Sequence, residues 1–543
     1  SVGAGRRGAL TPPGVAEGHD RGYYSLLYLA QALGASGWSQ ALQLKVLASE
    51  VHQVLRGDVA HPERSTTLGL VKVIPQEYHN VTCSLIDVDS PDAPTWGEGG
   101  ALDSLLVELR STAPGSVVAL RQQQRFVQGW EKVRVPAPEG RSPRVREGGV
   151  YLITGGLGGV MFVLGAYLAH VAKAKLVLTG RARLPERAGW ADWRQSHGDA
   201  DPISQRILRV QALEDLGAEV LTVSADVGDA AQMEEAFRQA EACFGAVHGV
   251  IHGAGIVAGN TFRPLQDVGQ AECEEQFHPK VAGLLALDRA LQGRDLDFCL
   301  LTSSLSSVLG GFAYGAYAAA NIFMDAYAAA HNQKPGPRWL SVNWDEWRLT
   351  ENSAEVGERA GGLAQFAMSG LEGAGAFARV LEVKGVSQLV VSTGDLQARI
   401  DQWIRLEALR EGRGAKAKAQ EASRHPRPHL QNAYVAPGNP TEQKIARIWA
   451  ELLGVEKVGI QDNFFDLGGH SLLAIQVVTR MKADLDAEVS MATLFEGPTV
   501  ESLSRLIGRE NSEPEGFEHS SDRGRKRKEE RQRRQAERVE GTT

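Results

Sequence analysis

The feature that most constrains the fold is a short apolar segment that runs directly into a cluster of glycines. Val150–Ile153 is predicted to be a buried strand, and a helical pattern follows Thr154-Gly155-Gly156-Leu157-Gly158-Gly159. Glycines at such a turn let the backbone approach a pyrophosphate, and the helix N-terminus supplies free N–H groups and partial positive charge. The segment therefore predicts a nucleotide-binding turn between a strand and a helix.

Further apolar segments recur along the chain, separated by helical patterns. The predicted strands are Lys175–Leu178, Glu219–Val223, Val247–His252, Asp297–Thr302, Leu340–Trp344 and Gln388–Ser392. This alternation is typical of an α/β fold with a doubly wound parallel sheet.

Polar or small residues follow three of these strands. Arg181 follows the second strand, where an arginine suits a ribose 2′-phosphate and hence NADPH. Asp226-Val227 follows the third strand, where a carboxylate can reach an adenine amino group. His252-Gly253-Ala254-Gly255 ends the fourth, where small residues let a cofactor lie close.

One residue departs from the glycine pattern. In G-x-G-x-x-G the glycines would be Gly156, Gly158 and position 161, which is Met161. The third glycine normally allows close packing of helix on strand. Met161 is thus expected either to be absorbed by a small backbone shift or to weaken cofactor binding.

An earlier α/β unit precedes the glycine turn. Tyr23–Leu33 has helical periodicity, whereas Leu42–Ala48 and Val81–Val88 are predicted strands. No glycine-rich turn follows a strand here. We therefore expect a scaffold without a cofactor of its own.

Composition excludes several classes of protein. The chain has 543 residues and a net charge of −8, which argues against a general nucleic-acid-binding protein. Its four cysteines lack metal-site spacing, which favours a reducing cytoplasm. No segment is apolar enough to predict a membrane span. The first residues are typical of an excerpt from a longer polypeptide.

Four residues predict carbonyl reduction. Ser304 follows a strand, and Tyr317 and Asn321 share one helix face four residues apart. A serine can polarise a carbonyl and a tyrosine can donate a proton to its oxygen. Lys280, expected at the start of an apolar helix, is the candidate ammonium that lowers the pKa of the tyrosine.

With these motifs, residues from about 20 to 400 resemble a modular polyketide synthase ketoreductase, of the extended short-chain dehydrogenase/reductase type. The resemblance implies that Tyr317 donates the proton, Ser304 polarises the carbonyl, Lys280 activates the tyrosine and contacts the ribose, and Asn321 holds a relay water. It also implies two Rossmann-like subdomains, of which only the second binds NADPH. Leu309 and Ile256-Val257-Ala258 stand where the family's two stereochemical signatures would lie, so neither product hand is assigned.

A second motif lies near the C-terminus. Asp462-Asn463-Phe464-Phe465-Asp466-Leu467-Gly468-Gly469-His470-Ser471 resembles the phosphopantetheine attachment site of acyl and peptidyl carrier proteins, which are four-helix bundles. Ser471 would carry the covalent 4′-phosphopantetheine, at a helix N-terminus that favours its phosphate.

The sequence thus predicts five parts: 1–145, a structural subdomain; 146–408, the catalytic NADPH-binding subdomain; 409–440, a flexible linker; 441–510, an acyl carrier domain; and 511–543, a basic tail that is disordered or docks on another chain. The predicted function is NADPH-dependent reduction of a β-ketoacyl thioester tethered to Ser471. Expected partners are a phosphopantetheinyl transferase and other synthase domains (ketosynthase, acyltransferase, a downstream module), and neither nucleic acid nor membrane. Two alternatives remain open: a carrier and docking module whose reductase is incompetent, and a free-standing metabolic dehydrogenase.

Overall fold

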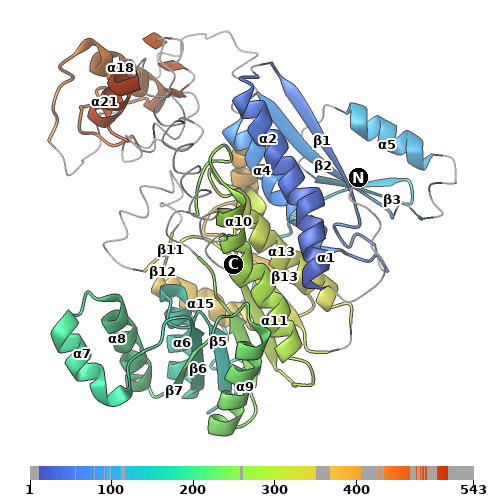
Figure 1. Cartoon of the computed structure of the whole chain (residues 1–543), viewed down its shortest axis with the longest axis vertical. Coiled ribbons are helices and arrows are strands. Elements are labelled where there is room, and N and C mark those ends of the chain that lie inside the picture. Colours follow the sequence, from blue (N-terminus) through green and yellow to red (C-terminus); the bar gives the residue numbers. More distant parts are fainter. Residues whose placement is uncertain are drawn as a thin grey trace, which may run out of the picture. The chain divides into compact units, whose positions relative to one another are not determined.

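Two sheets, one mostly parallel and one parallel throughout, organise the larger part of this computed structural model (Figure 1). Contacts divide the chain into two units, and the described residues fall up to 404 in one and from 426 in the other. The described residues are 11–38, 40–55, 57–78, 80–90, 92–93, 96, 100–111, 117–256, 261–334, 336–349, 367–404, 426–427, 433–464, 467, 473, 477–478, 480–481, 484–485, 494 and 498–510. The predicted tail 511–543 lies outside them.

The first subdomain has a four-stranded sheet in the order β1-β2-β3-β4. Its first three strands are parallel and the fourth is antiparallel to the third, an addition that the sequence did not predict. The strands are β1 Leu42–Ser49, β2 Val81–Val88, β3 Val117–Arg121 and β4 Gln124–Val127. The helices are α1 Pro12–Gly18, α2 Ser25–Ala35, α3 Pro62–Ser65, α4 Thr67–Glu77 and α5 Ala101–Arg110, with a π-helical segment His19–Tyr24 before α2.

The second subdomain has a seven-stranded parallel sheet in the order β13-β10-β9-β8-β5-β6-β7, so all six strands predicted after the glycine turn are confirmed. The strands are β5 Val150–Thr154, β6 Lys175–Gly180, β7 Glu219–Ser224, β8 Gly249–His252, β9 Phe298–Ser304, β10 Trp339–Trp344 and β13 Gln388–Val391. The helices are α6 Gly159–Ala172, α7 Trp190–His197, α8 Pro202–Asp215, α9 Ala230–Phe244, α10 Gln270–Phe277, α11 Gly283–Ala290, α12 Ser306–Leu309, α13 Gly315–His331, α15 Gly370–Val380 and α16 Leu396–Trp403. A two-stranded pair, β11 Trp347–Arg348 and β12 Met368–Ser369, lies beside this sheet.

Alternate residues of β5 point into different hydrophobic cores. Val150 and Leu152 join the core with α9, α11 and α13, whereas Tyr151 and Ile153 join the core with α6, α8 and α15. Successive side chains of a strand point to opposite faces of the sheet, and a strand that is buried on both faces is therefore apolar throughout. The chain order reverses between β5 and β8, and ligands bind at such a switch point outside the carboxyl ends of the strands.

Helix α13 joins the two subdomains. It packs on its own sheet and on α4, and residues of both helices share one hydrophobic core. A Cβ at Gly69 of α4 would lie 2.6 Å from the Ala319 amide nitrogen of α13. Only glycine allows this approach, so the first subdomain presses directly against the helix that carries Tyr317 and Asn321.

The second unit contains α18 Pro440–Leu453 and α21 Val500–Glu510 around a core that includes Trp449 and Phe464, whose ring centroids are 5.0 Å apart. Arg427 makes two hydrogen bonds to the buried Asp462, at 2.9 and 2.6 Å. Ile460 donates its amide to the Val435 carbonyl at 2.9 Å. Part of the predicted linker 409–440 therefore packs against the helical unit.

Replacing Arg427 should destabilise this unit. Burial raises the pKa of Asp462, but hydrogen bonds from Arg427 and the Gly459 amide outweigh it and leave the pKa below its usual value. We expect Arg427→Ala to cost about 3 kcal/mol at neutral pH, because it leaves a buried carboxylate without its cation. This cost should decrease as the pH falls below about 4 towards the pKa of Asp462 in the folded chain, because the protonated Asp462 no longer needs the cation.

Hydrogen exchange of the α18 amides in the full chain measures this cost. Arg480→Ala is the matched control, because its ion pair with Glu451 is largely exposed and should contribute at most about 1 kcal/mol. Equal effects of the two substitutions would contradict the role given to Arg427.

Candidate functional site

A cavity of about 1000 Å³ lies at the carboxyl ends of β5, β6, β7 and β8. Its lining includes these residues from the predicted cofactor site: Gly155, Leu157, Gly158, Arg181, Asp226, Val227, Ala254 and Gly255. Gly155 has φ +65°, and a Cβ there would lie 2.9 Å from the Gly253 carbonyl oxygen. The glycine turn is therefore a cradle that a side chain would fill. The cavity beside it is large enough for a dinucleotide.

Six residues of the predicted cofactor site lie outside the lining of this cavity: Gly159, Lys280 and Tyr317 line the second cavity described below, and Thr154, Gly156 and His252 line neither. The Thr154 hydroxyl is 2.8 Å from His252 Nδ1 and accepts from the Gly253 and Ala254 amides. Gly156 lies against Leu178, where a Cβ would approach to 2.9 Å. Burial lowers the pKa of His252 to about 3, so the ring is neutral. Thr154, Gly156 and His252 thus hold β5, β6 and β8 together beneath the cavity.

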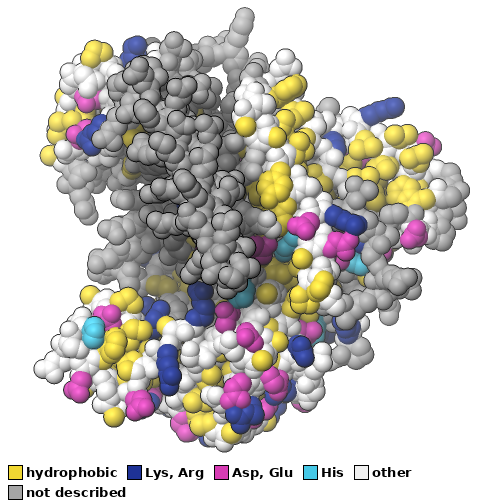
Figure 2. Space-filling model, viewed as in Figure 1, with side chains coloured by type: hydrophobic (Ala, Val, Ile, Leu, Met, Phe, Trp, Pro, Cys, Tyr) yellow, Lys and Arg dark blue, Asp and Glu magenta, His cyan; other side chains and the backbone are white. Residues whose placement is uncertain are grey.

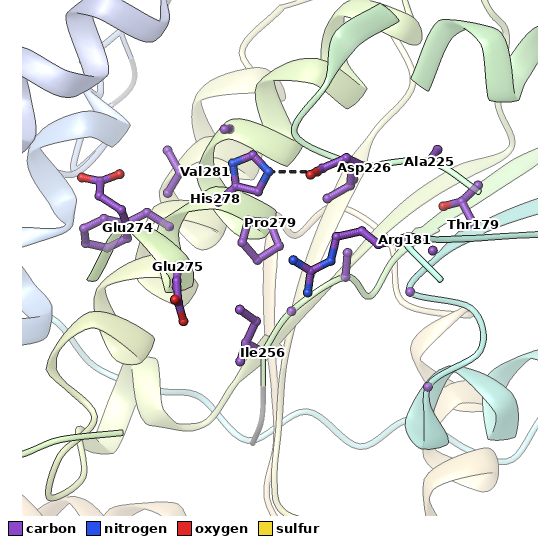
Figure 3. A pocket seen from close by; sticks show the side chains of 18 of the residues that line it. Thr179, Arg181, Ala225, Asp226, Ile256, Glu274, Glu275, His278, Pro279 and Val281 are labelled. Atoms are coloured by element: carbon purple, nitrogen blue, oxygen red, sulfur yellow. Dashed lines mark hydrogen bonds and ion pairs between the residues drawn. The ribbon is translucent and has the colours of Figure 1, made fainter. Parts of the chain in front are cut away.

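Figure 3 draws a number of the residues that line the cavity, and in it the Arg181 side chain extends beside Asp226. His278 Nε2 lies 2.8 Å from Asp226 Oδ1. Burial raises the pKa of Asp226, but the Gly228 amide, His278 and Arg181 together lower it below its usual value. Asp226 is therefore ionised and available as a hydrogen-bond acceptor.

Sequence reasoning missed two arginines that line the same cavity. Arg206 and Arg209 lie three residues apart on α8, and Arg209 donates to the Leu157 carbonyl of the glycine turn at 2.6 Å. Burial and the neighbouring Arg206 lower the pKa of Arg209. The sequence does contain a pattern that predicts them. Asp201-Pro202 is typical of the start of a helix, and a spacing of three places both arginines on one face of that helix.

A second cavity, of about 510 Å³, adjoins the first, and Gly155, Gly158 and Gly255 line both. Ser304, Tyr317 and Lys280 line this second cavity together. Ser304 ends β9, Tyr317 lies in the first turns of α13, and Lys280 lies between α10 and α11. The structure thus brings three of the four predicted catalytic residues to one space beside the glycine turn.

The fourth residue, Asn321, is fully buried one helical turn beyond Tyr317. Its amide nitrogen donates to the Tyr317 carbonyl at 2.8 Å. Asn321 is not among the residues lining the second cavity.

One expectation about Lys280 was wrong. It does not begin a helix, because the helical chain already starts at Gln270 and Lys280 lies in a π-helical segment, His278–Ala282. Its ammonium lies 5.8 Å from the Tyr317 ring centroid and donates to the Thr302 carbonyl at 3.3 Å. The pKa of Tyr317 is above its usual value, because burial outweighs the hydrogen bonds of Ser304 and Asn321. Burial lowers the pKa of Lys280 itself to about 8.

Met161 is accommodated by a glycine on another strand. The side chain is buried and lines the second cavity, and a Cβ at Gly253 would overlap its sulfur atom. The volume added at 161 therefore fills space that Gly253 leaves open after β8.

The two positions at which the family's stereochemical signatures would lie are placed only in part. Leu309 lines the second cavity and Ile256 the first, whereas Val257 and Ala258 lie outside the described residues. Ser471 and its neighbours Gly468, Gly469 and His470 also lie outside them.

Comparison with known proteins agrees with both sites. The family model "KR domain" matches residues 149–349, and "Phosphopantetheine attachment site" matches residues 443–507. The chain carries a ketoreductase domain and a phosphopantetheine carrier domain of the polyketide synthase type.

Relatives of this ketoreductase–carrier pair are large synthases. One component of the phenolphthiocerol/phthiocerol polyketide synthase of Mycobacterium tuberculosis is 28% identical over 486 residues, which are 89% of this chain and 24% of that protein. Polyketide synthase PksL of Bacillus subtilis is 28% identical over 501 residues, 88% of this chain and 10% of PksL. The chain therefore spans about a quarter or less of the length of these relatives.

Solved ketoreductases share the fold. An N-terminal ketoreductase from the macrolactin assembly line matches with TM-score 0.55 and 26% identity, covering 73% of this chain and 72% of that one. A-type ketoreductases from a modular polyketide synthase match with TM-score 0.56 and 26% identity, covering 72% and 75%. The two Rossmann-like subdomains and the helical carrier region predicted from the sequence are confirmed.

The surface and the helices give two further observations. On the face drawn in Figure 2, basic and acidic side chains of the described residues are interspersed. Within the described part of the chain, no helix combines the length and apolarity needed to cross a membrane.

The contact between positions 161 and 253 predicts coupled mutations. Gly253→Ala should lower the free energy of unfolding by about 1–3 kcal/mol, because the new methyl group overlaps Met161. In a Met161→Ala background the same change should cost much less, since the methyl group enters the vacated space. Thermal unfolding of the four chains gives the coupling energy, expected at about 1 kcal/mol or more. Additive effects would contradict the proposed fit.

Proposed function

We propose that this chain reduces a β-ketoacyl thioester, carried on its own phosphopantetheine arm, to the β-hydroxyacyl thioester. The observation that carries the proposal is the convergence of Ser304, Tyr317 and Lys280 on a cavity continuous with the glycine turn. Polyketide synthase relatives with this pair of domains support it. The phosphopantetheine arm would be added at Ser471 by a phosphopantetheinyl transferase, and the acyl chain would come from other synthase domains.

The residues of the second cavity have complementary roles in this reaction. When bound in the first cavity, a nicotinamide dinucleotide would supply the hydride that the β-carbon needs. The Ser304 hydroxyl holds the ketone oxygen by a hydrogen bond, and Tyr317 gives its phenolic proton to that oxygen as the carbonyl becomes an alcohol. Lys280, next to the Tyr317 ring, stabilises the phenolate left behind and contacts the ribose. Asn321 holds the backbone of α13 at Tyr317 and binds the water that returns the proton.

We further propose that the dinucleotide is NADPH. Arg181 reaches the first cavity from the end of β6, and Arg206 and Arg209 line the same space. A ribose 2′-phosphate adds negative charge that arginine binds well. Asp226 and Val227, at the end of β7, would contact the adenine ring.

The alternative of an incompetent reductase depended on Met161. Because Gly253 leaves room for the methionine side chain, the steric reason for that alternative is gone. A carrier segment in the same chain also speaks against a free-standing metabolic dehydrogenase.

Tyr317→Phe tests the proton donor. We expect NADPH consumption with a soluble β-ketoacyl thioester to fall by about 100-fold or more, because the phenylalanine has no proton to give. Stabilisation of the protein by NADPH should persist, since the first cavity is unchanged.

Tyr327→Phe is the matched control on the same helix, because Tyr327 packs against Trp339 and lines neither cavity. It should keep nearly full activity. An active Tyr317→Phe variant would reject the assigned role.

Arg181→Ala tests the cofactor preference. We expect the KM for NADPH to rise about tenfold or more while the KM for NADH changes little, because the substitution removes a charge-assisted bond to the 2′-phosphate. Arg187→Ala is the control, since Arg187 pairs with Glu214 at the surface. Equal rises for both cofactors would argue against a 2′-phosphate contact.

A further inference from the structure

One aromatic wall borders the second cavity close to Tyr317. Phe262 and Tyr314 both line the cavity, and the Phe262 ring centroid is 5.1 Å from that of Tyr314 and 5.4 Å from that of Tyr317, so the three rings contact one another. Phe262 belongs to the segment after β8, and Tyr314 to the segment between β9 and α13. The relative position of these two segments therefore sets where the aromatic wall stands beside Tyr317.

A single carboxylate from the other subdomain ties these two segments together. Glu77, the last residue of α4, accepts the Leu265 amide on one oxygen at 2.6 Å and the Ala313 amide on the other at 2.9 Å. Leu265 is three residues from Phe262, and Ala313 directly precedes Tyr314. Glu77 thus bridges, through backbone amides, the two segments that carry the aromatic wall.

Gln76, the residue before Glu77, holds the segment between β9 and α13 at further points. Gln76 accepts the Gly311 amide at 2.8 Å and donates to the carbonyls of Leu309 at 2.7 Å and Trp403 at 3.0 Å. Gly310, Gly311 and Ala313 have φ of +70°, +141° and +63°. Ala313 is in a conformation that residues with a side chain rarely adopt, so this segment needs support from outside.

The buried carboxylate of Glu77 serves backbone amides. Its two oxygens accept from the Leu265 and Ala313 amides, and burial raises its pKa to about 8 although both amides oppose the rise. A buried polar group is costly unless its hydrogen bonds are made. The hydrogen bonds to Glu77 offset this cost and hold the two amides at a fixed separation.

We propose that Glu77, assisted by Gln76, is a positioning and specificity-determining residue of the reductase, acting from the subdomain that has no cofactor turn. This inference rests on the proposed function, because the space beside the aromatic wall is assigned to the β-ketoacyl chain. Glu77 sets the position of this wall and thereby the orientation in which the substituent next to the ketone is accepted.

Glu77→Gln is the sharpest test. The amide side chain has the same shape, but its NH₂ group faces a backbone N–H, so one of the two bridges is lost. Glu108→Gln is the matched control, because Glu108 is also a buried glutamate of the first subdomain and bonds Arg125 away from both cavities.

The substrate is a racemic 2-methyl-3-oxoacyl thioester with NADPH, and the products are resolved by chiral chromatography. We expect Glu77→Gln to lower kcat/KM by about tenfold and to shift the ratio of diastereomeric alcohols at least threefold, with NADPH affinity within twofold of the parent. Glu108→Gln should leave the ratio unchanged. An unchanged ratio in Glu77→Gln, or an equal shift in Glu108→Gln, would overturn the proposal.

Hydrogen exchange provides a readout that does not depend on turnover. Exchange at 262–268 and 309–315 should rise in Glu77→Gln and not in Glu108→Gln. Unchanged exchange would overturn the positioning role. Gln76→Met should raise exchange at 309–315 alone and serves if Glu77→Gln does not fold. A parent protein that binds NADPH but reduces no thioester would reject the proposed function itself, and with it the role in substrate choice.

Discussion

The close packing of α4 on α13 is the contact on which the site depends. Gly69 lets the backbones of the two helices meet at Ala319, between Tyr317 and Asn321. Because α13 is buried between its own sheet and the first subdomain, it cannot shift without disturbing one shared core. The subdomain without a glycine turn is therefore part of the machinery that holds the phenol in place.

A buried polar network fixes the other end of α13. Asp325 accepts from Ser341 at 2.5 Å and from Asn343 at 2.7 Å, and Asn343 also donates to Ser303 beside Ser304. Burial raises the pKa of Asp325 to about 6, against the effect of these hydrogen bonds. Networks of this kind hold one arrangement when every member is bonded. This one joins α13, β9 and β10, the elements that carry or flank Ser304 and Tyr317.

The sequence predicted the parts of the site that depend on local pattern. The strand ends, the glycine turn and the candidate residues at 280, 304 and 317 could be predicted, because the hydrophobic period and the spacing of motifs determine them. The contacts of Glu77 with Leu265 and Ala313 could not be predicted. They join positions almost 190 and 240 residues apart, and they use backbone amides, which do not depend on the type of side chain. The same reason explains why Met161 looked disruptive, since Gly253, which leaves room for it, follows β8 and lies about 90 residues further along the chain. The raised pKa of Tyr317 follows from burial, which no motif encodes.

The central claim is that one chain both carries and reduces its substrate. The most direct measurement loads Ser471 with a β-ketoacyl phosphopantetheine, adds NADPH and follows the intact protein by mass spectrometry. We predict a gain of two hydrogen atoms on the carrier-bound acyl group, lost in the Tyr317→Phe chain. A loaded parent chain whose mass does not change in the presence of NADPH would contradict this claim.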